Sequence, residues 1–228
     1  MKDDPDTLRA RLDRLAELAK LVMEAEPEDR AHVERHSLRS WRRKLIVLLC
    51  SFVSVWIGAS DFYLGAMQIS GNFHPVVPGE FYRSAQPTAA DISYYQKEYG
   101  IRTIINLRGE NVGSDWYDDE IAQVQRLGIA HVNFRMSAKR ELTEAQFIEL
   151  VRILQNVEKP ILVHCNSGAD RSGLISALYV AAIAKMGEEA AESHLSWWYG
   201  HIPVLFRAAY AMDRTFENLE PALGFPNS

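Results

Sequence analysis

ILVHCNSGADRSG, residues 161–173, contains the strongest structural signal in this sequence. Its first residues are apolar and follow Pro160, which predicts a buried strand, and a helix is expected over about 172–185. A loop between a strand and a helix N-terminus directs several backbone N–H groups into one concavity, and the helix dipole adds to the attraction for an anion. The segment therefore predicts an anion-binding loop over residues 165–171.

Individual side chains of this loop suit the chemistry of phosphate esters. Gly168 permits the backbone torsions that a tight loop demands, and the guanidinium of Arg171 can bind two phosphate oxygens at once. Electropositive loops favour reactive thiols, so Cys165 at the loop entrance is the candidate nucleophile. Ser172 is expected to donate a hydrogen bond to the sulfur, and His164 to orient the loop from beneath. A buried thiol and a surface arginine spaced by chance would not explain this whole pattern.

The rest of the C-terminal part alternates between strand and helix patterns. The expected strands lie at 102–107 and 131–134, after an extended segment at 75–87. The expected helices begin at the N-caps Thr88 and Thr143 and at about residue 116, and two more precede Pro221. This alternation predicts a compact α/β domain over residues 70–228, with a short, mostly parallel sheet flanked by helices.

Residues 164–173 read HCNSGADRSG, which fits the pattern HCxxGxxR(S/T)G. Residues 81–87 (FYRSAQP) and 100–108 (GIRTIINLR) extend the likeness. The sequence resembles the cysteine-dependent protein tyrosine phosphatase superfamily, in its bacterial dual-specificity and atypical branch, over roughly 75–215.

This resemblance implies hydrolysis in two steps through a phosphocysteine, without a metal or another cofactor. Cys165 would be the nucleophile, Arg171 the phosphate ligand, and Ser172 would help the sulfur to leave. The phosphate-binding residues would be Asn166, Ser167, Gly168, Ala169, Asp170 and Arg171.

The general acid departs from the family pattern. Dual-specificity phosphatases usually supply an Asp some 30 residues before the cysteine, but residues 130–145 contain no Asp and offer Glu141 instead. Atypical bacterial members with C-x-x-G-K-D-R loops place an Asp directly before the arginine, as Asp170 stands here, although Ala169 replaces the lysine. We expect Asp170 to be the acid, with Glu141 as the alternative and a role for neither left open.

Residues 45–69 (LIVLLCSFVSVWIGASDFYLGAMQI) carry one charge, Asp61. As a helix they would extend about 37 Å, enough to cross a hydrocarbon core of about 30 Å. The preceding basic residues are Arg35, Arg39, Arg42, Arg43 and Lys44, and the next one is Arg83. This asymmetry predicts a single-pass anchor in the inner membrane, with the N-terminus cytoplasmic and the phosphatase domain periplasmic. A buried core helix and a cleaved signal peptide are the less favoured alternatives.

Residues 1–44 are expected to form a cytoplasmic helical segment. Leu8, Leu12, Leu15 and Val22 recur at helical spacing, so residues 6–25 would form either a weak homodimeric coiled coil or a solvated amphipathic helix.

Composition excludes several classes of function. Two cysteines rule out a disulfide scaffold and a cysteine zinc cluster. Residues 70–228 carry 14 basic and 19 acidic side chains, which argues against nucleic-acid binding. Asp115, Asp118, Asp119 and Glu120 are expected to be a solvated helix start rather than metal ligands, and Trp197, Trp198, Tyr199 and His201 to be core rather than a substrate wall.

The sequence therefore indicates a phosphatase that acts on phosphotyrosyl or phosphoseryl/threonyl proteins. A phosphatase of phospholipid headgroups, such as phosphatidylglycerophosphate or a phosphoinositide, is the alternative. A catalytically impaired phosphate-binding module is less favoured, because Cys165 and Arg171 are both present.

Overall fold

The computed structural model describes the chain except residues 1–4, 25–26, 203–207 and 226–228. The described chain divides into two compact units, one ending at Asp61 and one beginning at Phe62. The first unit contains α1 (Pro5–Glu24) and most of α2 (Pro27–Ile69). The second unit contains the sheet and the remaining helices.

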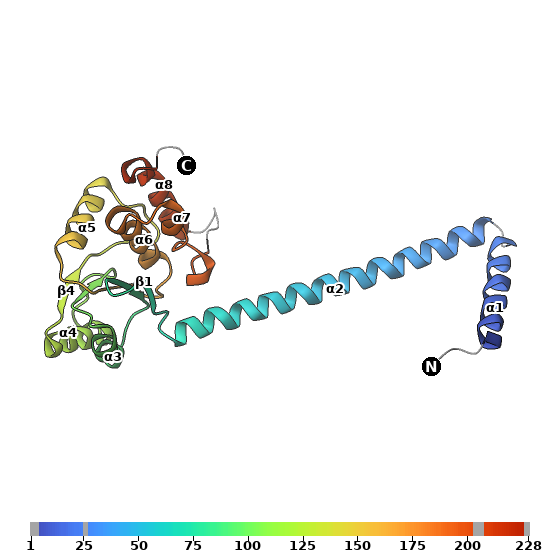
Figure 1. The fold of residues 1–228 in the computed structure, drawn as a ribbon, viewed down its shortest axis with the longest axis horizontal. Coiled ribbons are helices and arrows are strands. Elements are labelled where there is room, and N and C mark those ends of the chain that lie inside the picture. Colours follow the sequence, from blue (N-terminus) through green and yellow to red (C-terminus); the bar gives the residue numbers. More distant parts are fainter. Residues whose placement is uncertain (1–4, 25–26, 203–207, 226–228) are drawn as a thin grey trace. The chain divides into compact units, whose positions relative to one another are not determined.

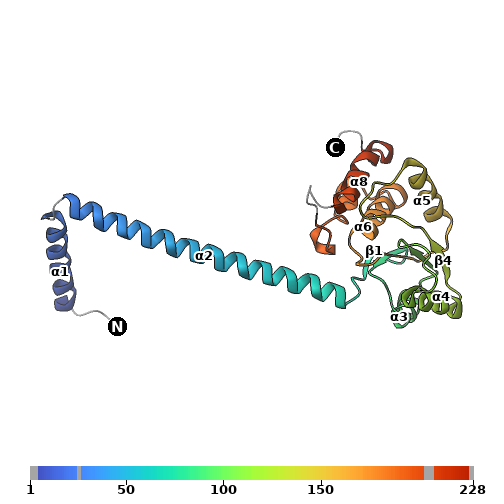
Figure 2. The same ribbon diagram turned by 180° about the vertical axis from the view of Figure 1, so that it is seen from behind.

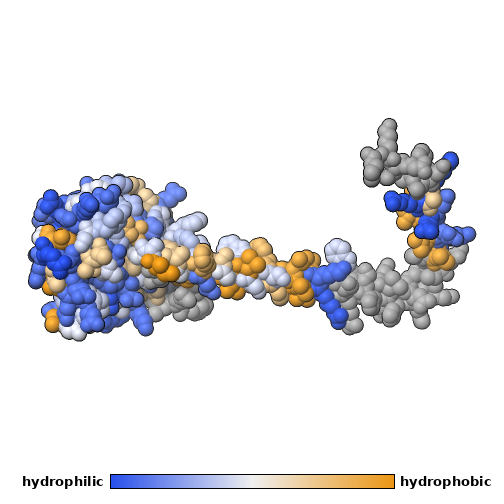
Figure 3. Space-filling view, turned by 90° about the horizontal axis from the view of Figure 1, so that it is seen from below, coloured by the Kyte–Doolittle hydropathy of each residue, from blue (hydrophilic) through white to orange (hydrophobic). Residues whose placement is uncertain are grey.

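Helix α2 contains the apolar segment. Residues Trp41–Met67 form a helix long and apolar enough to cross a membrane, and none of its most apolar window is buried in the protein. Figure 3 shows orange, hydrophobic side chains along this helix. Leu12 and Leu15 on α1 are also exposed. The membrane crossing, the cytoplasmic segment, the self-association and the expected domain boundaries stay predictions.

The second unit is built around a mixed five-stranded sheet in the order β1-β2-β5-β3-β4. Strand β1 (His74–Val77) pairs antiparallel with β2 (Phe81–Ser84). The other three, β3 (Thr103–Asn106), β4 (Ala130–Asn133) and β5 (Ile161–His164), join parallel to β2 and to one another. The expected α/β architecture with a short, mostly parallel sheet is confirmed.

Helices cover both faces of this sheet (Figures 1 and 2). On one side lie α3 (Ala89–Tyr99) and α4 (Asp115–Leu127), which end at the left-handed glycines Gly100 and Gly128. On the other side lie α5 (Glu144–Asn156), α6 (Asp170–Leu178), α7 (Glu188–Glu192) and α8 (Ala211–Leu223). The N-caps expected at Thr88 and Thr143 both form complete capping boxes.

Alternating side chains of the strands fill two cores. Phe81, Ile105 and Val163 belong to the core beneath α5, α6 and α8, while Ile104 and Leu162 belong to the core beneath α3 and α4. The helix that follows the Cys165 loop begins at Asp170, slightly before the expected start. It continues beyond Leu178 as a π-helical segment, Tyr179–Ala184. This early start places Arg171 in the first turn of α6.

Candidate active site

Cys165 follows the last residue of β5 and is almost completely buried. The backbone N–H of Gly168 donates to its Sγ at 3.3 Å. The hydroxyl of Ser172, in the first turn of α6, lies 3.4 Å from the same sulfur. The thiol therefore stands where the loop and the helix N-terminus direct their donors, and two of the predicted site residues meet at it.

Four carbonyl groups of the loop, those of residues 166–169, bond to the surrounding framework. The backbone N–H of Gln86 donates to the Asn166 carbonyl, and the Asn72 amide donates to the Ser167 carbonyl. The carbonyls of Gly168 and Ala169 both accept from a single guanidinium, described below. A peptide group places its N–H opposite its C=O, so carbonyls held on the outside leave the N–H groups for the inside of the loop. This arrangement suits an anion above Cys165.

Gly168 is required by two separate constraints. Its φ of +72° lies in the left-handed region. A Cβ at this position would also lie 2.6 Å from the backbone N of Ala85 and 2.8 Å from the carbonyl carbon of Ser84. The loop therefore packs directly on the end of β2.

Arg83 on β2 holds the loop from beneath, and its side chain is fully buried. Nη2 donates to the carbonyls of Gly168 and Ala169, both at 2.8 Å, and Nη1 donates to the carbonyl of His194 at 2.9 Å. The guanidinium also lies 4.5 Å from the ring centroid of Tyr199. Burial lowers the pKa of Arg83 to about 10, so it remains cationic at neutral pH. This role of Arg83 was not predicted from the sequence. The sequence signal available for it is the position of an arginine inside a buried strand, because a buried arginine needs hydrogen-bond partners.

Asn72 connects the same loop to the segment that follows α2. Its amide donates to the carbonyls of Ser167 and Tyr199 at 3.0 and 3.1 Å, and its Oδ1 lies 2.9 Å from Nε2 of His74. Nothing in the local sequence pattern indicated this role.

His164 supports the loop through a buried carboxylate. Its Nε2 lies 2.9 Å from Oε1 of Glu120, which also bonds His131 at 2.8 Å, while Oε2 accepts from Gln86. Burial alone would raise the pKa of Glu120, but the hydrogen bonds from His131, His164 and Gln86 lower it to about 2. The expectation that Glu120 belongs to a solvated helix start is therefore wrong.

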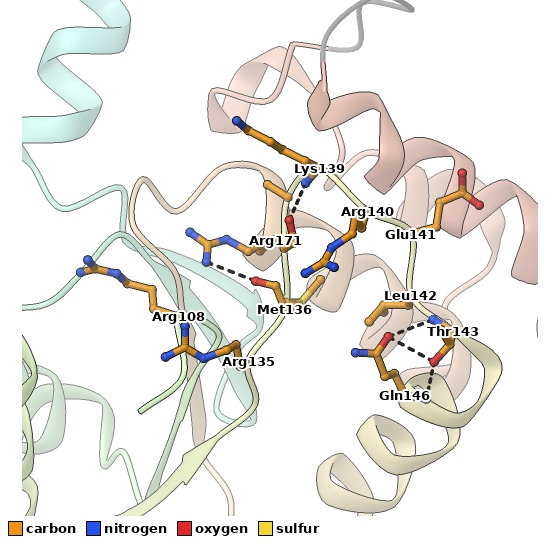
Figure 4. A pocket seen from close by; sticks show the side chains of 12 residues that line it. Arg108, Arg135, Met136, Lys139, Arg140, Glu141, Leu142, Thr143, Gln146 and Arg171 are labelled. Carbon is orange, nitrogen blue, oxygen red and sulfur yellow. Dashed lines mark hydrogen bonds between the residues drawn. The ribbon is translucent and has the colours of Figure 1, made fainter. Parts of the chain in front are cut away.

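Arg171 lines a cavity of about 750 Å³ (Figure 4). Its Nη1 lies 3.3 Å from the carbonyl of Leu107 and 3.5 Å from that of Met136. Arg108 lines the same cavity, held by Gln86 at 2.8 Å and stacked 3.5 Å from the centroid of Trp116. Burial and then the positive charge of Arg171 lower the pKa of Arg108. Two neighbouring guanidiniums beside the loop form a site for an anion.

The two candidate acids lie in different places. Asp170 is half-buried, its Oδ1 lies 2.8 Å from Nδ1 of His201, and it lines a smaller cavity on another side of the loop. Glu141 lines the Arg171 cavity, but its carboxylate accepts from Nε of Arg214 at 2.6 Å and from Asn218 at 3.1 Å. Figure 4 shows Glu141 turned away from Arg171. Both acids are engaged in ion pairs, and the identity of the general acid stays a prediction.

One acidic group of the described residues has the spacing of a metal site. Carboxylate oxygens of Glu188, Glu192 and Glu220, on α7 and α8, lie within 4.8 Å of one another. None of these residues lines the Arg171 cavity. Burial and then the negative charges of Glu220 and Glu188 raise the pKa of Glu192, as expected for neighbouring carboxylates.

Comparison with known proteins finds a matching family and similar relatives. Residues 75–199 match the model of a family described as "PTP-NADK: DSP-PTPase phosphatase fused to NAD+ Kinase". The dual specificity protein phosphatase TpbA of Pseudomonas aeruginosa (strain UCBPP-PA14) is 29% identical over 134 residues, which are 58% of this chain and 56% of that protein. This chain thus spans little more than half the length of that curated relative.

Solved structures agree with this match. The crystal structure of P. aeruginosa TpbA aligns with a TM-score of 0.53 at 25% identity, covering 68% of this chain and 92% of that chain. The catalytic core of the S. cerevisiae PP-IP phosphatase Siw14 aligns at 0.50 with 17% identity, covering 68% and 94%. PTPMT1 aligns at 0.51 with 15% identity, covering 67% and 98%. The latter two likenesses show the fold alone.

Proposed function

Because the chain belongs to the DSP-PTPase phosphatase family that residues 75–199 match, we propose that it hydrolyses phosphate monoesters through a phosphocysteine. The observation that carries this proposal is the position of the Cys165 sulfur. It accepts a hydrogen bond from the Gly168 N–H and lies beside the Ser172 hydroxyl. The loop carbonyls face outward and Arg171 stands over the neighbouring cavity.

The proposed reaction has two steps. The Cys165 thiolate attacks phosphorus, forming a P–S bond and breaking the P–O ester bond, while an acid protonates the departing oxygen. Water then attacks phosphorus and gives a proton to the base left by the first step, which restores the acid. The P–S bond breaks, and the Ser172 hydroxyl stabilises the thiolate that leaves. Arg171 and the loop N–H groups bind the phosphoryl oxygens in both steps.

We propose phosphotyrosyl or phosphoseryl/threonyl proteins as substrates. The relative TpbA is a dual specificity protein phosphatase, and a cysteine-to-serine variant of TpbA was crystallised in complex with pTyr. A phospholipid headgroup is the second candidate, favoured by the cationic cavity and the apolar helix. PTPMT1 was likewise crystallised with PI(5)P, at 14% identity to this chain.

We also propose that α2 crosses the inner membrane once, with its N-terminus in the cytoplasm and the phosphatase domain in the periplasm. Support comes from the length and exposure of Trp41–Met67, and from the exposed Arg42, Arg43 and Lys44 at its start. Cytoplasmic flanks of membrane helices are enriched in such charges.

The test uses the full chain in detergent with a phosphotyrosyl peptide, a phosphoseryl peptide, phosphatidylglycerophosphate and a phosphoinositide. Cys165→Ser should abolish turnover of every substrate and keep phosphate binding, because an alcohol is a far weaker nucleophile than a thiolate. Arg171→Lys should lower kcat/KM by about 100-fold or more, because an ammonium cannot replace the two-pronged guanidinium. Cys50→Ser, at an exposed cysteine of α2, is the matched control and should keep full activity. Activity that survives Cys165→Ser would remove the mechanism.

A further inference from the structure

The cavity beside Arg171 carries more positive charge than one phosphate group requires. Five basic side chains line it: Arg108, Arg135, Lys139, Arg140 and Arg171. Among the described residues, Glu141 is the one acidic side chain of the lining, and it is paired with Arg214. Figure 4 shows Arg108, Arg135 and Arg171 near one another and the Glu141 carboxylate turned away from them.

These five cations form two groups. Arg108 and Arg171 lie next to the Cys165 loop, where the scissile phosphate would bind. Arg135, Lys139 and Arg140 belong to the segment between β4 and α5, and all three are exposed. Within the described residues, none of these three side chains forms an ion pair with a carboxylate. Their charge is therefore available to a ligand.

One member of the outer group is held in place. The guanidinium of Arg135 donates to the carbonyl of Glu110. Gly109 packs against its stem so closely that a Cβ at Gly109 would lie 2.5 Å from Cβ and 2.7 Å from Nε of Arg135. A cation fixed in this way loses less conformational entropy when a ligand binds.

We propose that Arg135, Lys139 and Arg140 form a second anion subsite, which selects phosphorylated protein segments that carry an acidic side chain beside the phosphorylated residue. This inference rests on the proposed protein phosphatase function. A cavity of about 750 Å³ exceeds what a phosphate alone would occupy, and it leaves room for a neighbouring side chain. Its apolar lining consists of Met136, Ala138 and Leu142, which is little surface for an acyl chain.

The experiment compares phosphotyrosyl peptides of one length that differ only in the flanking residues, Asp/Glu in one and Asn/Gln in the other. The full chain in detergent should show a kcat/KM about tenfold higher for the acidic peptide, mainly through KM, because the subsite binds ground state and transition state alike. The preference should shrink as the salt concentration rises. In the double variant Lys139→Gln/Arg140→Gln the ratio should fall to within about twofold of one.

The matched control removes the same charge elsewhere. Lys97 and Arg126 are exposed in the last turns of α3 and α4, next to the strand starts and thus at the edge of the sheet opposite Cys165. Lys97→Gln/Arg126→Gln should keep the tenfold preference.

Three results would overturn the inference. Equal kcat/KM for both peptides in the wild type leaves the protein phosphatase function intact and removes the subsite. Loss of preference in both double variants assigns the effect to net charge. The subsite belongs to a lipid headgroup if kcat/KM is equal for the two peptides and turnover of phosphatidylglycerophosphate is lost only in Lys139→Gln/Arg140→Gln. Failure of the proposed function itself looks different, because then neither peptide is hydrolysed.

Discussion

The carboxylate of Asp170 accepts a hydrogen bond from Nδ1 of His201 at 2.8 Å, and this imidazole is completely buried. The other ring nitrogen, Nε2, donates to Asp213 at 3.0 Å. Burial alone would lower the pKa of His201, but the two carboxylates raise it to about 9. The ring is therefore cationic at neutral pH, and it joins the start of α6, beside the phosphate loop, to α8.

His201→Gln should therefore destabilise the protein in a pH-dependent way. The folded pKa of about 9 lies above the unfolded value of about 6.5, so the ion pairs contribute fully below about pH 6.5 and are lost as the pH rises through 9. We expect a cost on the order of 2 kcal/mol near pH 6, which is reduced because Asp170 is partly exposed to solvent. Thermal unfolding of both proteins between pH 6 and pH 10 measures it. A difference in Tm that does not change with pH would contradict a cationic His201.

Gly168→Ala should lower kcat much more than Gly128→Ala, although the two substitutions should destabilise the fold by similar left-handed strain. Gly168 and Gly128 have similar φ values, +72° and +66°. A Cβ at Gly128 would meet nothing within 4 Å, whereas a Cβ at Gly168 would lie 2.6 Å from the backbone N of Ala85, directly after β2. Both substitutions incur about 1–2 kcal/mol of left-handed strain. Only Gly168→Ala must displace the loop, so it should lower kcat by about 100-fold. Equal kcat values in the two variants would show that the loop tolerates the displacement.

Arg83→Met should both destabilise the fold and lower kcat. Methionine keeps much of the volume but removes the donor to the carbonyls of Gly168 and His194, and one of the two donors to the carbonyl of Ala169. Buried hydrogen bonds to a charged group are worth about 1.5–3 kcal/mol each, so we expect a loss of about 3 kcal/mol or more. Urea unfolding measures this loss, with the exposed Arg126→Met as a control that should stay within about 0.5 kcal/mol of wild type. A kcat that is unchanged in folded Arg83→Met would mean that Arg83 does not position the loop.

The sequence predicted what depends on local pattern. The strand Ile161–His164, the N-caps Thr88 and Thr143 and the meeting of Cys165 with Ser172 all follow from neighbouring residues. Contacts across long separations could not be read in this way. Glu120 looks like one more acidic residue at a helix start, because its partner His164 is 44 positions away.

The sequence pattern also does not show in which direction a side chain points. Glu141 falls in the segment where the family places its acid, yet Arg214, 73 positions later, draws the carboxylate toward α8. Asp170 directly precedes Arg171 in the sequence, but successive residues of a helix point in different directions. The two side chains accordingly line different cavities.

Reporter fusions should place the two ends of the chain on opposite sides of the membrane. Arg42, Arg43 and Lys44 precede the apolar helix, and no Lys or Arg occurs between residues 45 and 82. A C-terminal fusion to periplasmic alkaline phosphatase should be active, and a C-terminal fluorescent protein that folds only in the cytoplasm should be dark. Replacing Arg42, Arg43 and Lys44 by Gln should reduce the alkaline phosphatase signal. An inactive fusion with full-length protein present would reverse the proposed topology.

Asp170→Asn should slow poor leaving groups selectively, because we propose Asp170 rather than Glu141 as the acid. The carboxylate of Asp170 has one described partner, His201, so a single contact must break for it to turn toward the phosphate. Glu141 has two partners and would have to break both to turn toward the cavity. An activated leaving group such as p-nitrophenolate barely needs an acid, whereas an alkyl or tyrosyl oxygen does.

The measurement is therefore the ratio of kcat/KM for p-nitrophenyl phosphate to that for a phosphotyrosyl peptide, in Asp170→Asn and Glu141→Gln. Loss of the general acid should raise this ratio by about 10²–10⁴-fold. His201→Gln controls for disturbance of the loop, since it breaks the ion pair while leaving the Asp170 carboxyl in place. A large rise in Glu141→Gln alone would transfer the role to the segment between β4 and α5, because that carboxylate reaches the phosphate only if the segment closes over Arg171. No rise in either variant would mean that neither carboxyl protonates the leaving group, and that the departing oxygen takes its proton from solvent.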